Sequence, residues 1–267
     1  MSDTPEIPAP AERPPLEGLT VLIAGPAWSD EQQSAWQEML NATARPHELI
    51  WLDAPLPSGL GDAFRSGIER AQHPLILFVS LDYPYTPTDV PAMLERIAFT
   101  DPESGRALDL INGCRAARPV PLLNRWLGKA WRGMGNLLLD LGMTAPPGHL
   151  DARHRRYRFL YHMLFGLRVV DPMSGMKLFR RALLPRIPLQ SQGSFVWVEM
   201  LAKANFLGAF MDELPIATEA GQTNPPLPAW GPIRADLMNL LGKPDFGPPF
   251  LPASPPSEVA LHADTGH

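Results

Sequence analysis

The sequence predicts an α/β fold in which a mainly parallel sheet is flanked by helices within a single domain. Four short apolar runs alternate with stretches whose apolar residues recur at helical spacing, and this alternation is typical of βαβ units with right-handed crossovers. Apolar residues make up 45% of the chain, which is enough for a sizeable core. In such a sheet, ligands bind at the carboxyl ends of the strands. The residues that follow each apolar run are therefore candidates for function.

The first half of the chain supplies the predicted strands and the helices between them. The strands are expected at 19–24, 48–53, 74–81 and 107–113, and the helices at 30–41, 62–72 and 90–99. Gly25 and Pro26 close the first strand, because proline has no backbone N–H to continue a sheet. Ser29 or Asp30 is the expected cap of the first helix, since short polar side chains accept hydrogen bonds from the free N–H groups there.

The second half begins with two predicted helices. Apolar residues at three- and four-residue steps predict an amphipathic helix over 123–141, which a Pro-Pro-Gly break at 146–148 ends. Residues 151–166 start with a run of arginines and continue into apolar and aromatic residues. This segment is predicted to be a helix with a basic beginning and an apolar end.

Prolines concentrate near both ends of the chain. Residues 1–16 and 247–267 are rich in proline and lack periodic apolar residues, so they are predicted to be disordered or extended, which leaves a folded body at 17–246. We expect no signal peptide, because the first residues have neither a basic start nor an apolar core, and no apolar run is long enough to span a bilayer. The single cysteine, Cys114, suits a reducing compartment such as the cytoplasm.

Charge is distributed unevenly along the chain. The whole sequence has 23 Lys and Arg against 28 Asp and Glu, a balance that argues against a general nucleic-acid-binding protein. Between Gly113 and Arg186, however, 14 basic residues face only three acids. A basic block in an acidic chain indicates a local anionic partner. Both a phosphate group and a membrane surface meet this description.

Asp82 follows the third predicted strand. A carboxylate at this position can join a divalent cation to a diphosphate, because Mg²⁺ typically binds one or two protein carboxylates together with phosphate oxygens. The alternative is that Asp82 caps the helix beginning near Thr88. Thr86 and Thr88 are better placed for capping.

The motifs in the first half resemble those of glycosyltransferase family 2, in its dolichyl/polyprenyl-phosphate sugar transferase branch. The resemblance runs from about Leu19 to Ile216. The stretch after the first strand is Pro26-Ala27-Trp28-Ser29-Asp30-Glu31, and the acid after the second strand is Asp53. A G-x-G-x-A-x-x-x-G pattern runs from Gly59 to Gly67, and the aspartate after the third strand stands in Ser80-Leu81-Asp82 with Pro87.

Further motifs of the same family follow in the same order. The G-x-R after the fourth strand is Gly113-Cys114-Arg115, and the D-x-x-S-G-x-K-x-x-R-R signature runs from Asp171 to Arg181. An aromatic-then-acidic helix follows at Phe195 to Glu199, and a final E-L-P-I at Glu213 to Ile216. Each motif is short, but together, in the family's order and on the expected elements, they make the resemblance specific.

The resemblance implies a nucleotide-binding sheet of the GT-A type and transfer of a sugar from a nucleotide-sugar donor. Mg²⁺ or Mn²⁺ at Asp82 would neutralise the leaving diphosphate. Six residues would bind the donor: Pro26, Trp28, Asp30, Asp53, Gly61 and Asp82. Four basic residues would bind phosphates: Arg115, Lys177, Arg180 and Arg125.

The resemblance also implies how the acceptor reacts. A polyprenyl phosphate attacks through its own phosphate oxygen and needs no strong protein base. A hydroxyl acceptor would need one, and the candidates are Asp171 and Glu199. A structural alternative for Asp171 is that it caps a helix beginning near Ser174.

Several positions depart from the family pattern. Ser80 stands where the first metal-binding aspartate is usual, Pro84 replaces a polar residue, Leu60 replaces a basic one and Ser29 an asparagine. A single carboxylate can still hold Mg²⁺ when a diphosphate supplies the other ligands. These departures leave two readings open: an enzyme with an altered metal site, or a non-catalytic module that binds a nucleotide-sugar or a lipid phosphate.

The predicted helix at 153–168 also has two interpretations. Its arginines could form an ordinary solvated face. The cluster leading into Phe159, Leu160 and Tyr161 also fits a helix lying on an anionic membrane, where basic residues gain from the surface potential. We therefore expect peripheral contact with the inner face of the membrane.

Overall fold

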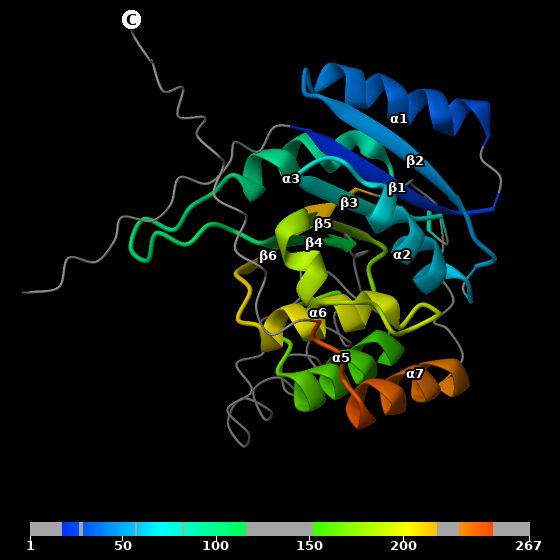
Figure 1. The fold of residues 1–267 in the computed structure, drawn as a ribbon, viewed down its shortest axis with the longest axis vertical. Helices are drawn as coiled ribbons and strands as arrows, with labels where there is room; N and C mark the ends of the chain where they lie inside the picture. The colour runs from blue at the N-terminus through cyan, green and yellow to red at the C-terminus, as the bar shows by residue number, and fades with distance from the viewer. Residues whose placement is uncertain are drawn as a thin grey trace, which may run out of the picture.

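A computed structural model describes residues 18–26, 29–56, 58–81, 83–115, 152–217 and 230–247 of the chain. These residues form one six-stranded sheet with helices on both faces (Figure 1). The strands are β1 (Leu19–Gly25), β2 (His47–Asp53), β3 (Leu75–Ser80), β4 (Leu110–Arg115), β5 (Met176–Arg180) and β6 (Met211–Ile216). The predicted helix at 123–141 lies outside the described residues.

The sheet is mainly parallel, as predicted. Its strand order is β2-β1-β3-β5-β4-β6. β1 pairs in parallel with β2 and β3, and β4 with β6, whereas β5 runs antiparallel between β3 and β4. Every residue of β1, β3 and β4 is buried, which is the pattern of strands covered by helices on both faces.

Two helices cover one face of the sheet. They are α1 (Asp30–Ala42) and α3 (Val90–Ile97), which follows a short 3₁₀ turn, η1 (Pro87–Asp89). Their apolar side chains pack with alternate residues of β1 and β3 in a single core. Ser29 caps α1 as predicted: its hydroxyl accepts a hydrogen bond from the backbone N–H of Gln32, and the Gln32 side chain accepts one from the backbone N–H of Ser29.

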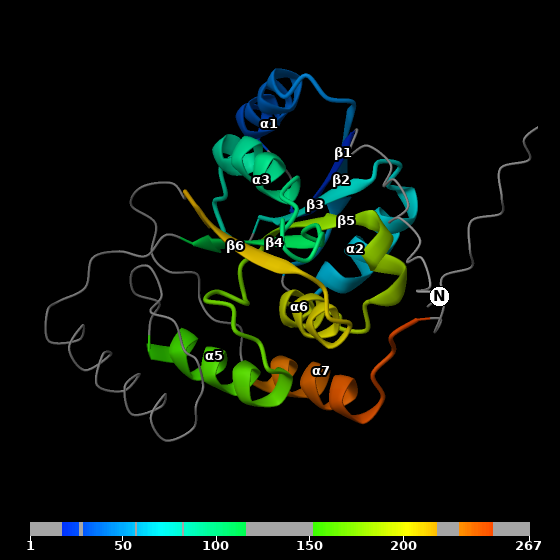
Figure 2. The ribbon, with the colours of Figure 1, turned by 90° about the vertical axis from the view of Figure 1, so that its left-hand side faces the viewer.

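The other face is covered in two layers, which Figure 2 shows below the sheet. The inner layer consists of α2 (Leu60–Arg70) and α6 (Val196–Phe206), and the outer layer of α5 (Ala152–Phe165) and α7 (Trp230–Gly242). Phe64 joins the inner layer to the sheet, because its ring lies 5.1 Å from that of Phe78 and 5.0 Å from that of Trp197. A second 3₁₀ turn, η2 (Arg181–Arg186), leads from β5 to α6.

Candidate active site

The candidate site lies at the edge of the sheet where β3 and β4 end. Because β5 is antiparallel, the turn that precedes it comes to the same edge, and the backbone N–H of Ser80 donates to the carbonyl of Gly175 over 2.9 Å. The motifs after β3, after β4 and before β5 are therefore neighbours in space although the chain separates them widely. Ser80, at the usual place of the first metal-binding aspartate, is fully buried.

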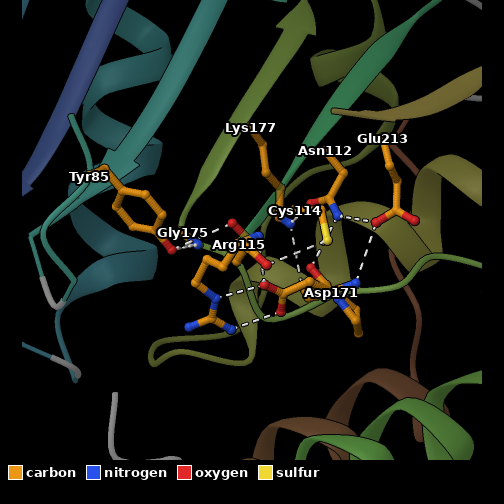
Figure 3. Close-up of polar contacts among 10 residues, drawn as sticks. Tyr85, Asn112, Cys114, Arg115, Asp171, Gly175, Lys177 and Glu213 are labelled. Atoms are coloured by element: carbon orange, nitrogen blue, oxygen red, sulfur yellow. Dashed lines mark hydrogen bonds and ion pairs between the residues drawn. The ribbon is translucent and has the colours of Figure 1, made fainter. Parts of the chain in front are cut away.

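Arg115 and Asp171 form the central charged pair of this edge (Figure 3). The Arg115 Nε and Nη2 groups donate to the two Asp171 carboxylate oxygens over 2.6 and 2.8 Å, and the Arg115 backbone N–H donates over 3.3 Å. The side chains are only 8% and 1% exposed. No helix begins near Ser174, since β5 starts at Met176, so the capping alternative for Asp171 is wrong.

Two tyrosines lie beside this pair. The Tyr85 hydroxyl accepts a hydrogen bond from the backbone N–H of Gly175 over 2.6 Å, and the Tyr83 ring centre lies 5.3 Å from the Arg115 guanidinium carbon. Asp82, between Leu81 and Tyr83, lies outside the described residues. The sequence analysis assigned no role to either tyrosine, although two tyrosines within three residues after a candidate metal ligand are a detectable signal.

Lys177 lies beneath the pair and is completely buried. Its ammonium group donates to the Asn112 side-chain carbonyl and, over 3.3 Å, to the carbonyl of Pro172. Burial lowers the pKa of Lys177 to about 7, against the opposing influence of Asp171 and Glu213. The prediction that Lys177 binds phosphate does not agree with this position, because the side chain is enclosed and supports the turn before β5.

Arg180 lies at the far end of β5. It pairs with Leu75 at the start of β3, so it sits at the opposite edge of the sheet from Arg115. Its guanidinium donates to the backbone carbonyls of Leu108 and Ile97 over 2.5 and 3.0 Å. The structure therefore separates Arg180 from Arg115. Arg125 and the donor-site residue Trp28 lie outside the described residues.

The predicted donor-binding residues around β1 and β2 are only partly brought together. Asp53 is exposed at the end of β2 and is paired in register with Gly25, next to the exposed Pro26. Asp30 is exposed in the first turn of α1. An exposed carboxylate beside a strand end can accept hydrogen bonds from a nucleobase or ribose.

Gly61 has a packing role. It is buried at the start of α2, and its backbone N–H donates to the carbonyl of Gln192 over 2.9 Å. A Cβ atom at this position would lie 1.8 Å from the Ser191 carbonyl oxygen. Only glycine permits this approach between α2 and the loop before α6.

Glu199 in α6 holds that same loop. Its carboxylate oxygens accept hydrogen bonds from the backbone N–H groups of Gln190 and Ser191, both over 2.7 Å, and one oxygen lies 2.7 Å from the Lys203 ammonium. Both charged side chains are buried. The expectation that Glu199 is a catalytic base is therefore not supported, because its lone pairs are already used within the fold.

Among the residues that the structure describes, no group of three His, Cys, Asp or Glu side chains could hold a metal ion. Pro84 is half-buried after β3. Asp82 thus remains the predicted metal ligand, at a strand end whose neighbours are described.

Comparison with known proteins gives similarity in structure only. No protein-family profile matches the chain, and no curated protein matches it in sequence. Solved structures of glucosyl-3-phosphoglycerate synthase from Mycobacterium tuberculosis are similar in fold. One, in complex with phosphoglyceric acid, has a TM-score of 0.57 at 16% identity, covering 86% of this chain and 81% of that one.

Two further structures of the same enzyme contain metal and nucleotide. The complex with Mn²⁺, UDP-glucose and phosphoglyceric acid has a TM-score of 0.53 at 16% identity, and the complex with Mg²⁺ and UDP has 0.52 at 18%. In both comparisons the matched region covers 86% of this chain and 81% of the synthase chain. These neighbours are GT-A-type glycosyltransferases. The chain therefore has the GT-A fold that its motifs predicted.

Proposed function

We propose that this chain is a glycosyltransferase that moves a hexose from a nucleotide-sugar donor to an acceptor carrying a phosphate group. The observation that carries the proposal is the buried Arg115–Asp171 pair at the carboxyl edge of a GT-A sheet, next to the strand end that leads into Asp82. The fold of the neighbours, which include a complex with UDP-glucose, supports it. Family 2 is the proposed family, because the sequence carries motifs that resemble those of this family in the same order.

The donor is proposed to bind across the ends of β1, β2 and β3. Asp53 would contact the base or ribose, and Pro26, Trp28 and Asp30 would line the path from the base to the diphosphate. Gly61 would act indirectly by allowing α2 to pack against the loop at 190–192. The catalytic body is proposed to run from 17 to 246.

A divalent cation is proposed to bind at Asp82. A single aspartate offers hard oxygen ligands, which suit Mg²⁺ or Mn²⁺ when phosphate oxygens complete the coordination. The fully buried Ser80 supports a site with one carboxylate. When bound, the cation would neutralise charge on the leaving diphosphate.

The transfer is proposed to proceed with inversion. A phosphate oxygen of the acceptor attacks the anomeric carbon, the bond from that carbon to the donor diphosphate breaks, and the nucleoside diphosphate leaves. No protein base is required, because the attacking oxygen is already anionic. This agrees with Asp171 being engaged by Arg115 and with Glu199 being buried in its own contacts.

A polyprenyl phosphate is the proposed acceptor, and the outer helices support this choice. Of the eight large apolar side chains that are exposed in the described part of the chain, six lie on α5 and α7: Phe159, Met163, Leu164, Trp230, Met238 and Leu241. The two helices adjoin, since the rings of Tyr157 and Trp230 are 5.9 Å apart. No helix among the described residues is long and apolar enough to cross a membrane.

Charge supports an anionic membrane as the partner of this face. The sequences of α5 and α7 together contain five arginines and one aspartate. That aspartate, Asp236, accepts hydrogen bonds from the backbone N–H groups of Gln192 and Gly193. Apolar side chains with an excess of arginine are typical of helices that lie in the interface of an anionic bilayer. The protein is accordingly proposed to act at the cytoplasmic face of a membrane.

The test is a transfer assay with radiolabelled UDP-glucose and GDP-mannose, with and without Mn²⁺. Undecaprenyl phosphate in detergent and phosphoglyceric acid serve as alternative acceptors. We expect metal-dependent transfer to the lipid phosphate and a loss of about a hundredfold in Asp82→Ala. Glu95→Ala, which changes an exposed acid on α3, is the control. Transfer only to phosphoglyceric acid would refute the lipid acceptor, and no transfer under any condition would refute the enzyme.

A non-catalytic binding module is the second candidate, and Ser80 is the observation that favours it. Restoring the family residue with Ser80→Asp separates the two. A large rise in turnover from near zero supports a module whose site has degenerated. Little change, with measurable turnover in the natural chain, supports a working one-carboxylate site.

A further inference from the structure

The turn Val170–Pro172 is held by polar side chains from three different strands. Glu213 comes from β6, Asn112 from β4 and Lys177 from β5 (Figure 3). All three bind backbone groups of this turn. The turn carries Asp171, so whatever fixes its backbone also fixes the partner of Arg115.

Glu213 makes the most contacts with the turn. One carboxylate oxygen accepts a hydrogen bond from the backbone N–H of Val170 over 2.6 Å, and the other accepts from the backbone N–H of Asp171 over 3.4 Å. The second oxygen also accepts from the Asn112 side-chain amide over 2.8 Å. A carboxylate can accept all three bonds at once, whereas an amide of the same shape offers only one oxygen.

Asn112 connects Glu213 to the rest of the network. Its amide nitrogen also donates to the Asp171 carbonyl over 3.1 Å, and its side-chain carbonyl accepts from the Lys177 ammonium. Asn112 and Lys177 are both fully buried. Since each donor and acceptor in the network has a partner here, a change at Glu213 leaves buried groups without one.

Position in the sheet sets Glu213 apart from a residue that only stabilises the fold. Within the described ranges, β6 is an edge strand that pairs with β4 alone, yet its Glu213 side chain binds a turn from another part of the chain. Burial raises the pKa of Glu213, while the hydrogen bonds from Val170, Asn112 and Asp171 oppose that rise. Burial disfavours the charged carboxylate, and the three hydrogen bonds to its two oxygens offset that desolvation. The contacts therefore depend on Glu213 having two acceptor oxygens.

We propose that Glu213 is a positioning residue, which places Asp171 through the backbone of the Val170–Pro172 turn and thereby orients the Arg115 guanidinium toward the phosphate of the acceptor. The inference rests on the proposed function for the identity of that ligand. It assigns Glu213 no contact with substrate and no proton transfer. Glu213 acts on Arg115 through its hydrogen bonds to the backbone of Val170 and Asp171 and through the Arg115–Asp171 pair.

The experiment compares Glu213→Gln with a matched control, Glu48→Gln. Glu48 also uses its carboxylate to accept a backbone hydrogen bond, from Gln72 over 2.6 Å, and one from the Thr20 hydroxyl over 2.5 Å. It lies on β2, at the amino end of the sheet. Both variants remove one carboxylate charge at a half-buried position, but both Glu48 bonds go to a single oxygen, which an amide keeps. Glu48→Gln therefore controls for the loss of a half-buried charge.

The first measurement is the NMR signal of the Arg115 Nε–H, which is bonded to Asp171. We expect Glu213→Gln to shift this signal and to speed its exchange with solvent, and Glu48→Gln to leave it unchanged. An unchanged signal in Glu213→Gln overturns the inference even if the protein proves to have no transferase activity. This measurement therefore separates the inference from the proposed function.

The second measurement is steady-state kinetics in the assay described above. We expect Glu213→Gln to raise the acceptor KM by about tenfold, the size expected for a lost hydrogen bond to a charged group, and to leave the donor KM within about twofold. Equal losses for donor and acceptor overturn the inference. If Glu213→Gln does not fold, Glu213→Asp, which keeps both oxygens but shortens the reach, is measured in the same way.

Discussion

Arg115 and Asp171 are joined by two hydrogen bonds of 2.6 and 2.8 Å, one to each carboxylate oxygen, although 56 positions separate them in the chain. Paired bonds of this kind fix the plane of the guanidinium as well as its distance. The pair links the end of β4 to the turn before β5. It is therefore both a connection within the fold and the charged centre of the candidate site.

Removing the carboxylate of this pair should destabilise the protein strongly. Asp171→Asn leaves the Arg115 charge buried without its partner, which costs about 3 kcal/mol or more of unfolding free energy. Urea unfolding measures the loss. Asp62→Asn, at the exposed ion pair with Arg65, is the control and should change stability by less than about 1 kcal/mol, because the Asp62 side chain is 72% exposed. Equal effects would contradict a buried pair.

Lys177 should make stability depend on pH. Its pKa is lowered from 10.5 to about 7 in the fold, so above pH 7 the unfolded chain binds a proton that the folded protein releases. The unfolding free energy therefore rises with pH between about 7 and 10.5, by up to about 1.4 kcal/mol per pH unit. Below pH 7 both states are protonated, and this gain is absent.

Urea unfolding between pH 7 and 8.5 tests this dependence. The range stays below the ordinary pKa of the Cys114 thiol, which burial raises to about 12 in the fold. Asp171, Glu213 and Arg115 are the other charged groups that act on Lys177, and Lys177→Met should flatten the slope. A slope that persists unchanged in this variant would mean that another group titrates.

Gly61→Ala should disturb the contact between α2 and the loop before α6. The added methyl group would lie 1.8 Å from the Ser191 carbonyl oxygen, so one backbone segment must move. We expect a loss of about 1–3 kcal/mol and, from the proposed function, a higher donor KM. Gly231→Ala in α7, where a Cβ meets nothing within 4 Å, should be neutral or stabilising by up to about 1 kcal/mol. If the two variants behave alike, the close approach is not present in solution.

The face of α5 and α7 should bind anionic membranes. Co-sedimentation with vesicles of phosphatidylglycerol and phosphatidylcholine is expected to exceed that with phosphatidylcholine alone, and to fall as salt is added. The double variant Met163→Glu with Met238→Glu should abolish it, because both side chains are more than half exposed on this face.

Phe99→Glu provides the matched control for that experiment. Phe99 is also an exposed apolar residue, but it follows α3 on the opposite side of the sheet. We expect this variant to sediment like the natural chain. Loss of binding in all variants alike would indicate a general charge effect, and no binding by the natural chain would refute the membrane face. If the natural chain forms a dimer and the double variant is a monomer, the face is a dimer interface and not a membrane-binding surface.

Local features allowed much of the fold to be predicted. The predicted strands at 19–24, 48–53 and 74–81 match β1, β2 and β3 to within one residue, because a buried strand between two helical layers must be continuously apolar. The helices α1 and α3 were predicted for a similar reason, from helical spacing and polar caps. β5 and β6 were not predicted as strands, since Lys177, Glu213 and Pro215 interrupt their apolar pattern.

The candidate site was predicted in part. The D-x-x-S-G motif and the G-x-R motif do meet at one edge of the sheet. Asn112 was missed, although a polar residue inside an apolar run is a detectable signal. The pairing of Arg115 with Asp171 has no signal in a single sequence, because charge alone does not specify which of several acids a given arginine contacts.

The sequence by itself determined the α/β class, the boundaries of β1, β2 and β3 to within one residue, and the concentration of basic residues in its second half. Tertiary structure decided what those basic residues do. Lys177 and Arg180 are three positions apart, but on an extended strand that distance is about 10 Å. Because β5 runs antiparallel inside the sheet, it buries Lys177 beneath the site and carries Arg180 to the opposite edge. Of the three predicted phosphate-binding residues that the structure describes, Arg115, at the end of a parallel strand, lies at the edge where an acceptor phosphate is proposed to bind.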